Sequence, residues 1–209
     1  MGVLNRGILG GFRGSVGPVT GTSWKGIDVM KSKPLSVANP RTPAQTAQRG
    51  KFAGAVSFAK RLLATVVKPL WDRFAQKESG YNAFIQANIG IFNENGNPSP
   101  ADALVISQGN WDNVSGLNSV NLDTSGQLFF NANTDGGLPT DEIYVAVYDS
   151  DDNKVVGALC PTDRSEGDHT IELGMSFQQG NTFNLYIATR RADGTAVSNT
   201  IWTQENVSA

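Results

Sequence analysis

His169 and Cys160 are the side chains best suited to catalysis in this sequence, and each is the single residue of its type among 209. A general base or a nucleophile works only beside a positioned partner. Ser165 and Asp168 are near His169 along the chain, but adjacency in sequence does not create the geometry of a catalytic triad. Cys160 ends an apolar run and precedes a proline, which is typical of a small buried hydrophobic residue. We therefore predict structural roles for both, no catalytic residues, and a protein that is not an enzyme.

The acidic run DSDDN at 149–153 is the best candidate for a metal site. A calcium-binding EF-hand loop needs oxygen ligands at positions 1, 3 and 5, Gly at position 6 and Glu at position 12. Counted from Asp149, position 6 is Lys154 and position 12 is Cys160. The run is therefore predicted to be a hairpin turn, and we expect no metal.

The glycine-rich run GILGGFRGSVGPV at 7–19 is the best candidate for a phosphate-binding loop. It matches neither G-x-G-x-x-G nor G-x-x-x-x-G-K-[ST]. A phosphate-binding loop also lies directly before a helix, and the first helical pattern here begins only near residue 42. No cofactor is expected.

Charge is distributed unevenly along the chain. Residues 1–77 hold 13 Lys and Arg and two acidic residues, a net charge of +11, whereas residues 78–209 hold four Lys and Arg and 17 acidic residues, a net charge of −13. Such asymmetry indicates a basic part that binds a partner and an acidic, solvated part. One cysteine cannot form an internal disulfide, which favours a reducing compartment. No apolar stretch approaches the ~18 residues of a membrane span.

The first 41 residues are predicted to be a basic, glycine-rich arm with a β-hairpin over 15–32. Glycines inside strands are typical of close approach by another backbone, and a large aromatic such as Trp24 suits an interface. We expect partner chains to order this arm. The predicted interface residues are Phe12, Trp24, Lys25, Ile27, Lys31, Lys33 and Arg41.

Residues 42–92 are predicted to be a helical unit. Thr42, Pro43 and Gln45 form an N-terminal capping signal, and apolar residues then recur at three- and four-residue steps from Phe52 to Val66. A second helix is expected to end near Gly80, and a third segment to cover 81–92.

Residues 101–209 change to the period of β-strands. Eight short runs separated by Gly, Asn, Asp and Pro predict an antiparallel, immunoglobulin-like β-sandwich. The runs are 103–109, 119–123, 127–133, 142–149, 154–160, 169–174, 181–190 and 195–204. The predicted class is α+β, with three parts: 1–41, 42–92 and 101–209.

Three motifs carry a resemblance to a known family. They are SWKG at Ser23–Gly26, the helix start with Arg41, Thr42, Gln45, Arg49, Lys51 and Phe52, and the GYNA segment at Gly80–Ala83. Over roughly the first 90 residues the chain resembles an uncharacterised family of Bacteroidota that also occurs in bacteriophages of that phylum, among them the crAss-like phage virion proteins. The resemblance implies a virion component without enzymatic activity.

The function expected from these observations is structural. We predict a repeated subunit of a bacteriophage neck or tail ring, located in the virion and assembled in the cytoplasm of the bacterial host. Its partners would be further copies of the chain, in a ring, and other virion proteins, with no membrane contact. Two alternatives remain open: a Bacteroidota cell protein that binds ligands through its sandwich, and a packaging or cargo protein whose basic part contacts DNA.

Overall fold

The computed structural model describes residues 3–4, 12–24, 26–33, 36, 39–133 and 136–208. Contacts between residues divide the chain into two compact units, Met1–Thr42 and Pro43–Ala209. The boundary between them agrees with the predicted end of the arm.

The first unit is a small antiparallel sheet. Its strands lie in the order β1 (Val3–Leu4), β2 (Phe12–Val16), β3 (Val19–Trp24) and β4 (Ile27–Ser32). β3 and β4 pair residue for residue from Val19 opposite Ser32 to Trp24 opposite Ile27. The hairpin predicted over 15–32 is therefore confirmed, and two further strands extend it.

The second unit begins with a helical layer. Helix α1 (Pro43–Arg61) leads through a π-helical turn η1 (Leu63–Val67) into α2 (Lys68–Trp71), and after a non-helical stretch the chain forms α3 (Gly80–Asn88). The hydroxyl of Ser79 caps α3 by accepting a hydrogen bond from the Asn82 amide at 3.3 Å. Short 3-10 turns η2 (Ile89–Ile91), η3 (Ala101–Ala103) and η4 (Arg164–Glu166) complete the helical elements of the described chain.

Two antiparallel sheets follow. One has the order β11-β10-β7-β8, with β7 (Glu142–Asp149), β8 (Lys154–Leu159), β10 (Thr182–Arg190) and β11 (Ile201–Asn206). The other has the order β5-β6-β9, with β5 (Ser115–Leu122), β6 (Gln127–Asn133) and β9 (Asp168–Glu172).

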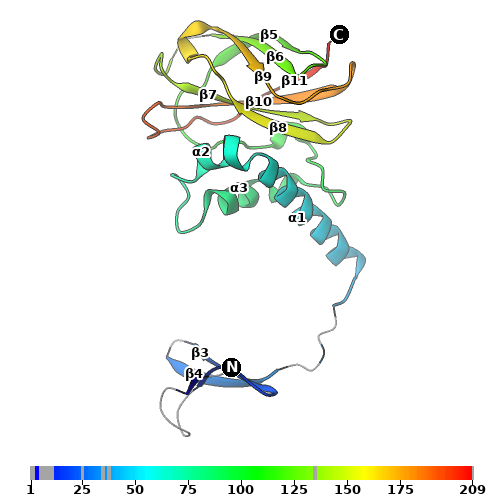
Figure 1. Ribbon diagram of the computed structural model, residues 1–209, viewed down its shortest axis with the longest axis vertical. Helices are drawn as coiled ribbons and strands as arrows, with labels where there is room; N and C mark the ends of the chain where they lie inside the picture. Colours follow the sequence, from blue (N-terminus) through cyan, green and yellow to red (C-terminus); the bar gives the residue numbers. More distant parts are fainter. Residues whose placement is uncertain are drawn as a thin grey trace. The chain divides into compact units, whose positions relative to one another are not determined.

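The four-stranded sheet is the middle of three layers, with the helices on one side and the three-stranded sheet on the other (Figure 1). Alternate residues of β7 enter two separate cores: Tyr144, Ala146 and Tyr148 pack with the helices, while Ile143 and Val145 pack with the three-stranded sheet. Since both faces of β7 and β10 are covered, both strands read as nearly continuous apolar runs in the sequence.

The helices differ from the sequence prediction in extent. The helix predicted for 42–66 ends at Arg61, and the second helix, predicted to end near Gly80, has only four residues. Phe52 was placed on the apolar face of the first helix, but it is 52% exposed, and Phe58 is buried instead.

The run 103–109 is not a strand, and this prediction was wrong. Its backbone amides and carbonyls form hydrogen bonds with side chains rather than with a neighbouring strand. The buried amide of Asn88 donates to the Val105 carbonyl and accepts from the Val105 amide, at 2.9 and 2.8 Å, and the Trp71 indole donates to the Ile106 carbonyl at 2.7 Å. Thr200 accepts from the amides of Ile106 and Ser107. The run is apolar because Leu104 and Ile106 enter the helical core.

The helices and the sheets are thus one compact unit rather than the two parts predicted, because apolar residues of the helices and of the four-stranded sheet share one core. No helix in the described ranges is long and apolar enough to cross a membrane.

Candidate functional site

The predicted interface residues lie mainly on the small N-terminal sheet. All six residues of β4 are exposed, with Ile27 at 62% and Val29 at 40%. Phe12 is half-buried, and Lys31, Lys33 and Arg41 are exposed. Trp24 is placed in β3 opposite Ile27, while its side chain and the whole of Lys25 lie outside the described residues.

The two faces of this sheet differ. The strand register places Ile27, Val29 and Lys31 on one face, which we call the open face, beside Thr20 and Thr22 of β3. On the opposite face Phe12 covers Gly21, where an added Cβ would lie 2.8 Å from the Phe12 ring. The open face therefore combines apolar and basic side chains that nothing in the described chain buries.

Two apolar residues on the other face were missed by the sequence prediction. Met30 is 69% exposed and Val16 is 56% exposed. Side chains alternate between the two faces along IDVMKS, so Met30 lies on the face opposite Ile27 and Val29. This alternation is the sequence signal that could have identified Met30 as a second exposed apolar residue.

His169 and Cys160 lie together, but as a buried structural pair. His169 accompanies Ile171 on the inner face of β9 and is fully buried, and its Nδ1 is 2.7 Å from the Thr162 hydroxyl and 3.6 Å from the Cys160 Sγ. Burial lowers the pKa of His169 and raises the pKa of Cys160. Both shifts favour the neutral forms, whereas a nucleophilic cysteine needs a thiolate beside an imidazolium. The arrangement supports the prediction of structural roles.

The acidic run 149–153 is a hairpin turn between β7 and β8. Asp149 Oδ1 accepts hydrogen bonds from the amides of Asp151 and Asp152, and its Oδ2 accepts one from the Asn181 side chain. Lys154 pairs with Asp152 at 2.8 Å. Nowhere in the described ranges do three or more His, Cys, Asp or Glu side chains gather as metal ligands.

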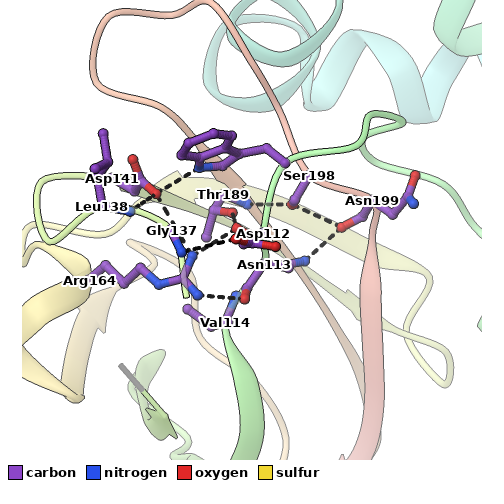
Figure 2. Close-up of polar contacts among 11 residues, drawn as sticks. Asp112, Asn113, Val114, Gly137, Leu138, Asp141, Arg164, Thr189, Ser198 and Asn199 are labelled. Carbon is purple, nitrogen blue, oxygen red and sulfur yellow. Dashed lines mark hydrogen bonds and ion pairs between the residues drawn. The ribbon is translucent and has the colours of Figure 1, made fainter. Parts of the chain in front are cut away.

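A buried polar network at one end of the two packed sheets was not predicted (Figure 2). The guanidinium of Arg164, 1% exposed, donates to the carbonyls of Asp112 and Asn113 at 2.8 and 2.7 Å and lies 3.8 Å from the carboxylate of Asp141, which is also buried. Asp141 Oδ2 in turn accepts from the Trp111 indole and the Leu138 amide at 2.7 and 2.8 Å. This network joins three segments that are distant in sequence, 111–113, 138–141 and Arg164, so its role is to hold this end of the two packed sheets together.

A pocket of about 440 Å³ lies beside the edge strand β11. Trp202 lines it together with polar groups of Asp102, Gln108 and Asn199. The Trp202 indole is oriented by a 3.1 Å hydrogen bond to Asn184. A pocket with one aromatic and a few polar groups is a general site for a small ligand.

The comparisons with known proteins show the family of the chain. Residues 11–204 match the profile of the Family of unknown function (DUF6266). The chain belongs to this family. A search of curated proteins finds no match.

Two solved structures are similar to part of this DUF6266 chain. The fn3 domain of the human collagen alpha-1(XX) chain has 9% sequence identity and a TM-score of 0.37, over 49% of this chain and 90% of that one. A family 76 glycoside hydrolase from a bovine Bacteroides thetaiotaomicron strain has 10% identity and a TM-score of 0.35, over 46% of this chain and 20% of that one. Both TM-scores are too low to carry a conclusion about this protein.

Proposed function

We propose that this protein is a structural subunit of a larger assembly, a repeated component of a bacteriophage neck or tail ring that acts through its N-terminal sheet. The observation that carries the proposal is the open face of that sheet. Ile27 and Val29 are exposed there beside basic residues, on a strand with no buried residue.

A sheet of this kind is poorly suited to exist alone. Small sheets need an apolar face packed on another layer for independent stability, and ordering each residue costs about 1–2 kcal/mol in backbone entropy. Ile27, Val29 and Met30, which could contribute to such a core, are exposed in this unit. A partner that covers the open face would supply the missing burial, at roughly 25 cal/mol per Å² of apolar surface.

Charge supports identical copies as partners. The first 77 residues carry a net charge of +11 and the remainder carries −13. Contact between the basic part of one copy and the acidic part of the next would be electrostatically complementary and head-to-tail, and head-to-tail contacts close into rings when the rotation allows. The resemblance to virion proteins of Bacteroidota phages supports the location. The two antiparallel sheets also agree with an immunoglobulin-like sandwich.

A second candidate function is ligand binding by the sandwich of a Bacteroidota cell protein. The pocket at Trp202 favours it, because an oriented aromatic side chain and several polar residues line the same pocket. The third, association with DNA, would use the basic residues of the N-terminal part.

The test is the mass of the full chain in solution, measured by light scattering and compared with a variant lacking residues 1–40. The second unit has its own cores, so the shortened variant is expected to fold, which circular dichroism would verify. A discrete cyclic oligomer that is lost on truncation supports the assembly function, and an oligomer that survives truncation contradicts the role of the sheet. A monomer that binds an external ligand would favour the second candidate, and binding to DNA that falls steeply with salt would favour the third.

A further inference from the structure

We propose that the open face of the N-terminal sheet docks on the outer face of the three-stranded sheet β5-β6-β9 of a second copy of the chain. This inference rests on the proposed assembly function and names the surface that the arm would bind.

The outer face of the three-stranded sheet has a defined composition. Strand alternation places Gln127, Phe129 and Asn131 of β6 outward, because Leu128, Phe130 and Ala132 enter the core between the sheets. The register pairs these three with Glu172, Thr170 and Asp168 of β9, all exposed. An aromatic ring thus lies at the centre of the face, with a carboxylate toward each end of the neighbouring strand.

The two carboxylates are held in position. Asp168 accepts a hydrogen bond from the Asn131 amide at 2.7 Å, and Glu172 accepts one from the Gln127 amide at 2.8 Å. Neither bond neutralises the charge, since both donors are uncharged amides. Strands β5, β6 and β9 contain no Lys or Arg, so this face has no basic group of its own strands to compensate its charge.

The open face has the complementary composition. Ile27 and Val29 offer exposed aliphatic surface, and Lys31 and Lys33 follow them along the same side of the chain, where the Lys33 amide continues the pairing by donating to the Pro18 carbonyl. An aliphatic patch beside two cations therefore matches an aromatic patch beside two anions. The same arrangement disfavours pairing of two open faces, because it would bring four lysines together.

The two surfaces are different from each other, so the contact is heterologous and propagates from copy to copy. Each face is small: three strands about 4.8 Å apart and roughly 17–20 Å long cover about 300 Å², less than half of the ~800 Å² that each partner buries in a standard interface. A single contact is therefore weak, and several contacts in a closed ring would be needed for a stable assembly.

Charge reversal tests the proposal directly. One full-length variant carries Asp168→Lys and Glu172→Lys, and a second carries Lys31→Glu and Lys33→Glu. Each places like charges across the contact, so each alone should weaken assembly in sedimentation velocity by about tenfold or more. A third variant that carries all four substitutions should assemble again, because every contact then joins an acidic pair on the open face to a lysine pair on β9. The control, Glu78→Lys with Glu205→Lys, changes two exposed acidic residues elsewhere and should assemble normally.

The outcomes separate this inference from the proposed function. Three results overturn the docking surface while the assembly function stands: an oligomer that resists both reversals, one that responds equally to the control, and one that does not form in the variant with all four substitutions. A wild-type chain that stays monomeric at every concentration removes both. All substituted side chains are exposed, so circular dichroism is expected to show unchanged folding.

Discussion

At Gly54 on α1, helix propensity and packing make opposite predictions about how replacement by alanine changes the stability of the fold. In an ordinary exposed helix, replacing Gly by Ala stabilises by about 1 kcal/mol. Here an added Cβ would lie 2.6 Å from the carbonyl carbon of Gly96 and closer still to the Gly96 Cα and oxygen, whereas ordinary van der Waals contact begins at 3.4 Å. Gly54→Ala therefore requires the helix and the turn at 93–97 to separate by about 1 Å.

The turn resists such a shift. The side chain of Asn93 accepts hydrogen bonds from the amides of Asn95 and Asn97, both at 3.0 Å, and the Asn93 amide donates to the Asn97 carbonyl at 2.9 Å. The preceding residue, Phe92, is buried and packs edge-on against Phe58 with ring centroids 5.7 Å apart. Overpacking against fixed atoms costs about 1–3 kcal/mol. Because the three Gly96 atoms in collision all belong to the backbone, we take the upper part of this range. Subtracting the gain in helix propensity leaves a net loss of about 1–2 kcal/mol.

The assay is urea unfolding followed by tryptophan fluorescence, with the midpoint of thermal unfolding as a second measure. A loss of this size lowers Tm by about 2–8 °C in a chain of this length. Gly90→Ala is the matched control, since nothing lies within 4 Å of an added Cβ there, and it should be neutral or stabilise by up to about 1 kcal/mol. If Gly54→Ala proves as stable as the wild type or more so, the close packing of this turn on α1 is refuted.

Two further predictions concern buried polar groups. Arg164→Met should destabilise by about 3–5 kcal/mol, because it leaves the buried Asp141 carboxylate without its cation and removes the hydrogen bonds that the guanidinium donates to the carbonyls of Asp112 and Asn113. In the same denaturant series Lys154→Met, at a partly exposed ion pair, should cost less than about 1 kcal/mol. Equal losses in the two variants would contradict the assigned role of the network. Burial lowers the pKa of His169, so the His169 imidazole binds a proton more readily in the unfolded chain than in the folded one. The stability contributed by the neutral ring is complete above the ordinary pKa of 6.5 and is lost as the pH falls below it. Urea midpoints at pH 7 and pH 5 should therefore differ more in the wild type than in His169→Gln, and identical differences would argue against the lowered pKa.

Sequence periodicity identified most of the strands in the second unit, and physical reasons explain where it failed. Seven of the eight predicted runs contain strands in the described chain, because alternation and turn residues are local properties. The run 103–109 satisfies the same local pattern, yet the side chains that occupy its backbone groups come from Asn88, Trp71 and Thr200. The residues of the run itself give no indication of hydrogen-bond partners that are so distant in sequence.

The candidate sites were likewise predictable from the sequence only in part. Ile27, Lys31 and Lys33 are exposed, in agreement with the predicted interface. The sequence could indicate this, because apolar and basic residues interspersed with glycines are typical of a segment that does not pack into a core of its own. The acidic outer face of β9 and β6 was not predicted, because strand register decides which residues share a face.

The sequence by itself determined the opposite charges of the two parts, the boundary of the arm near residue 42, seven of the eight predicted strand segments and the absence of the tested catalytic and phosphate-binding motifs. Each of these depends on residue type and short-range spacing. The tertiary structure alone decided that the helices cover the four-stranded sheet, that His169 is buried, that Arg164 joins residues 112–113 to Asp141, and that Gly54 touches Gly96. These features depend on which distant segment covers each apolar surface. A local sequence pattern shows that an apolar surface must be buried, but only the folded chain shows which segment buries it.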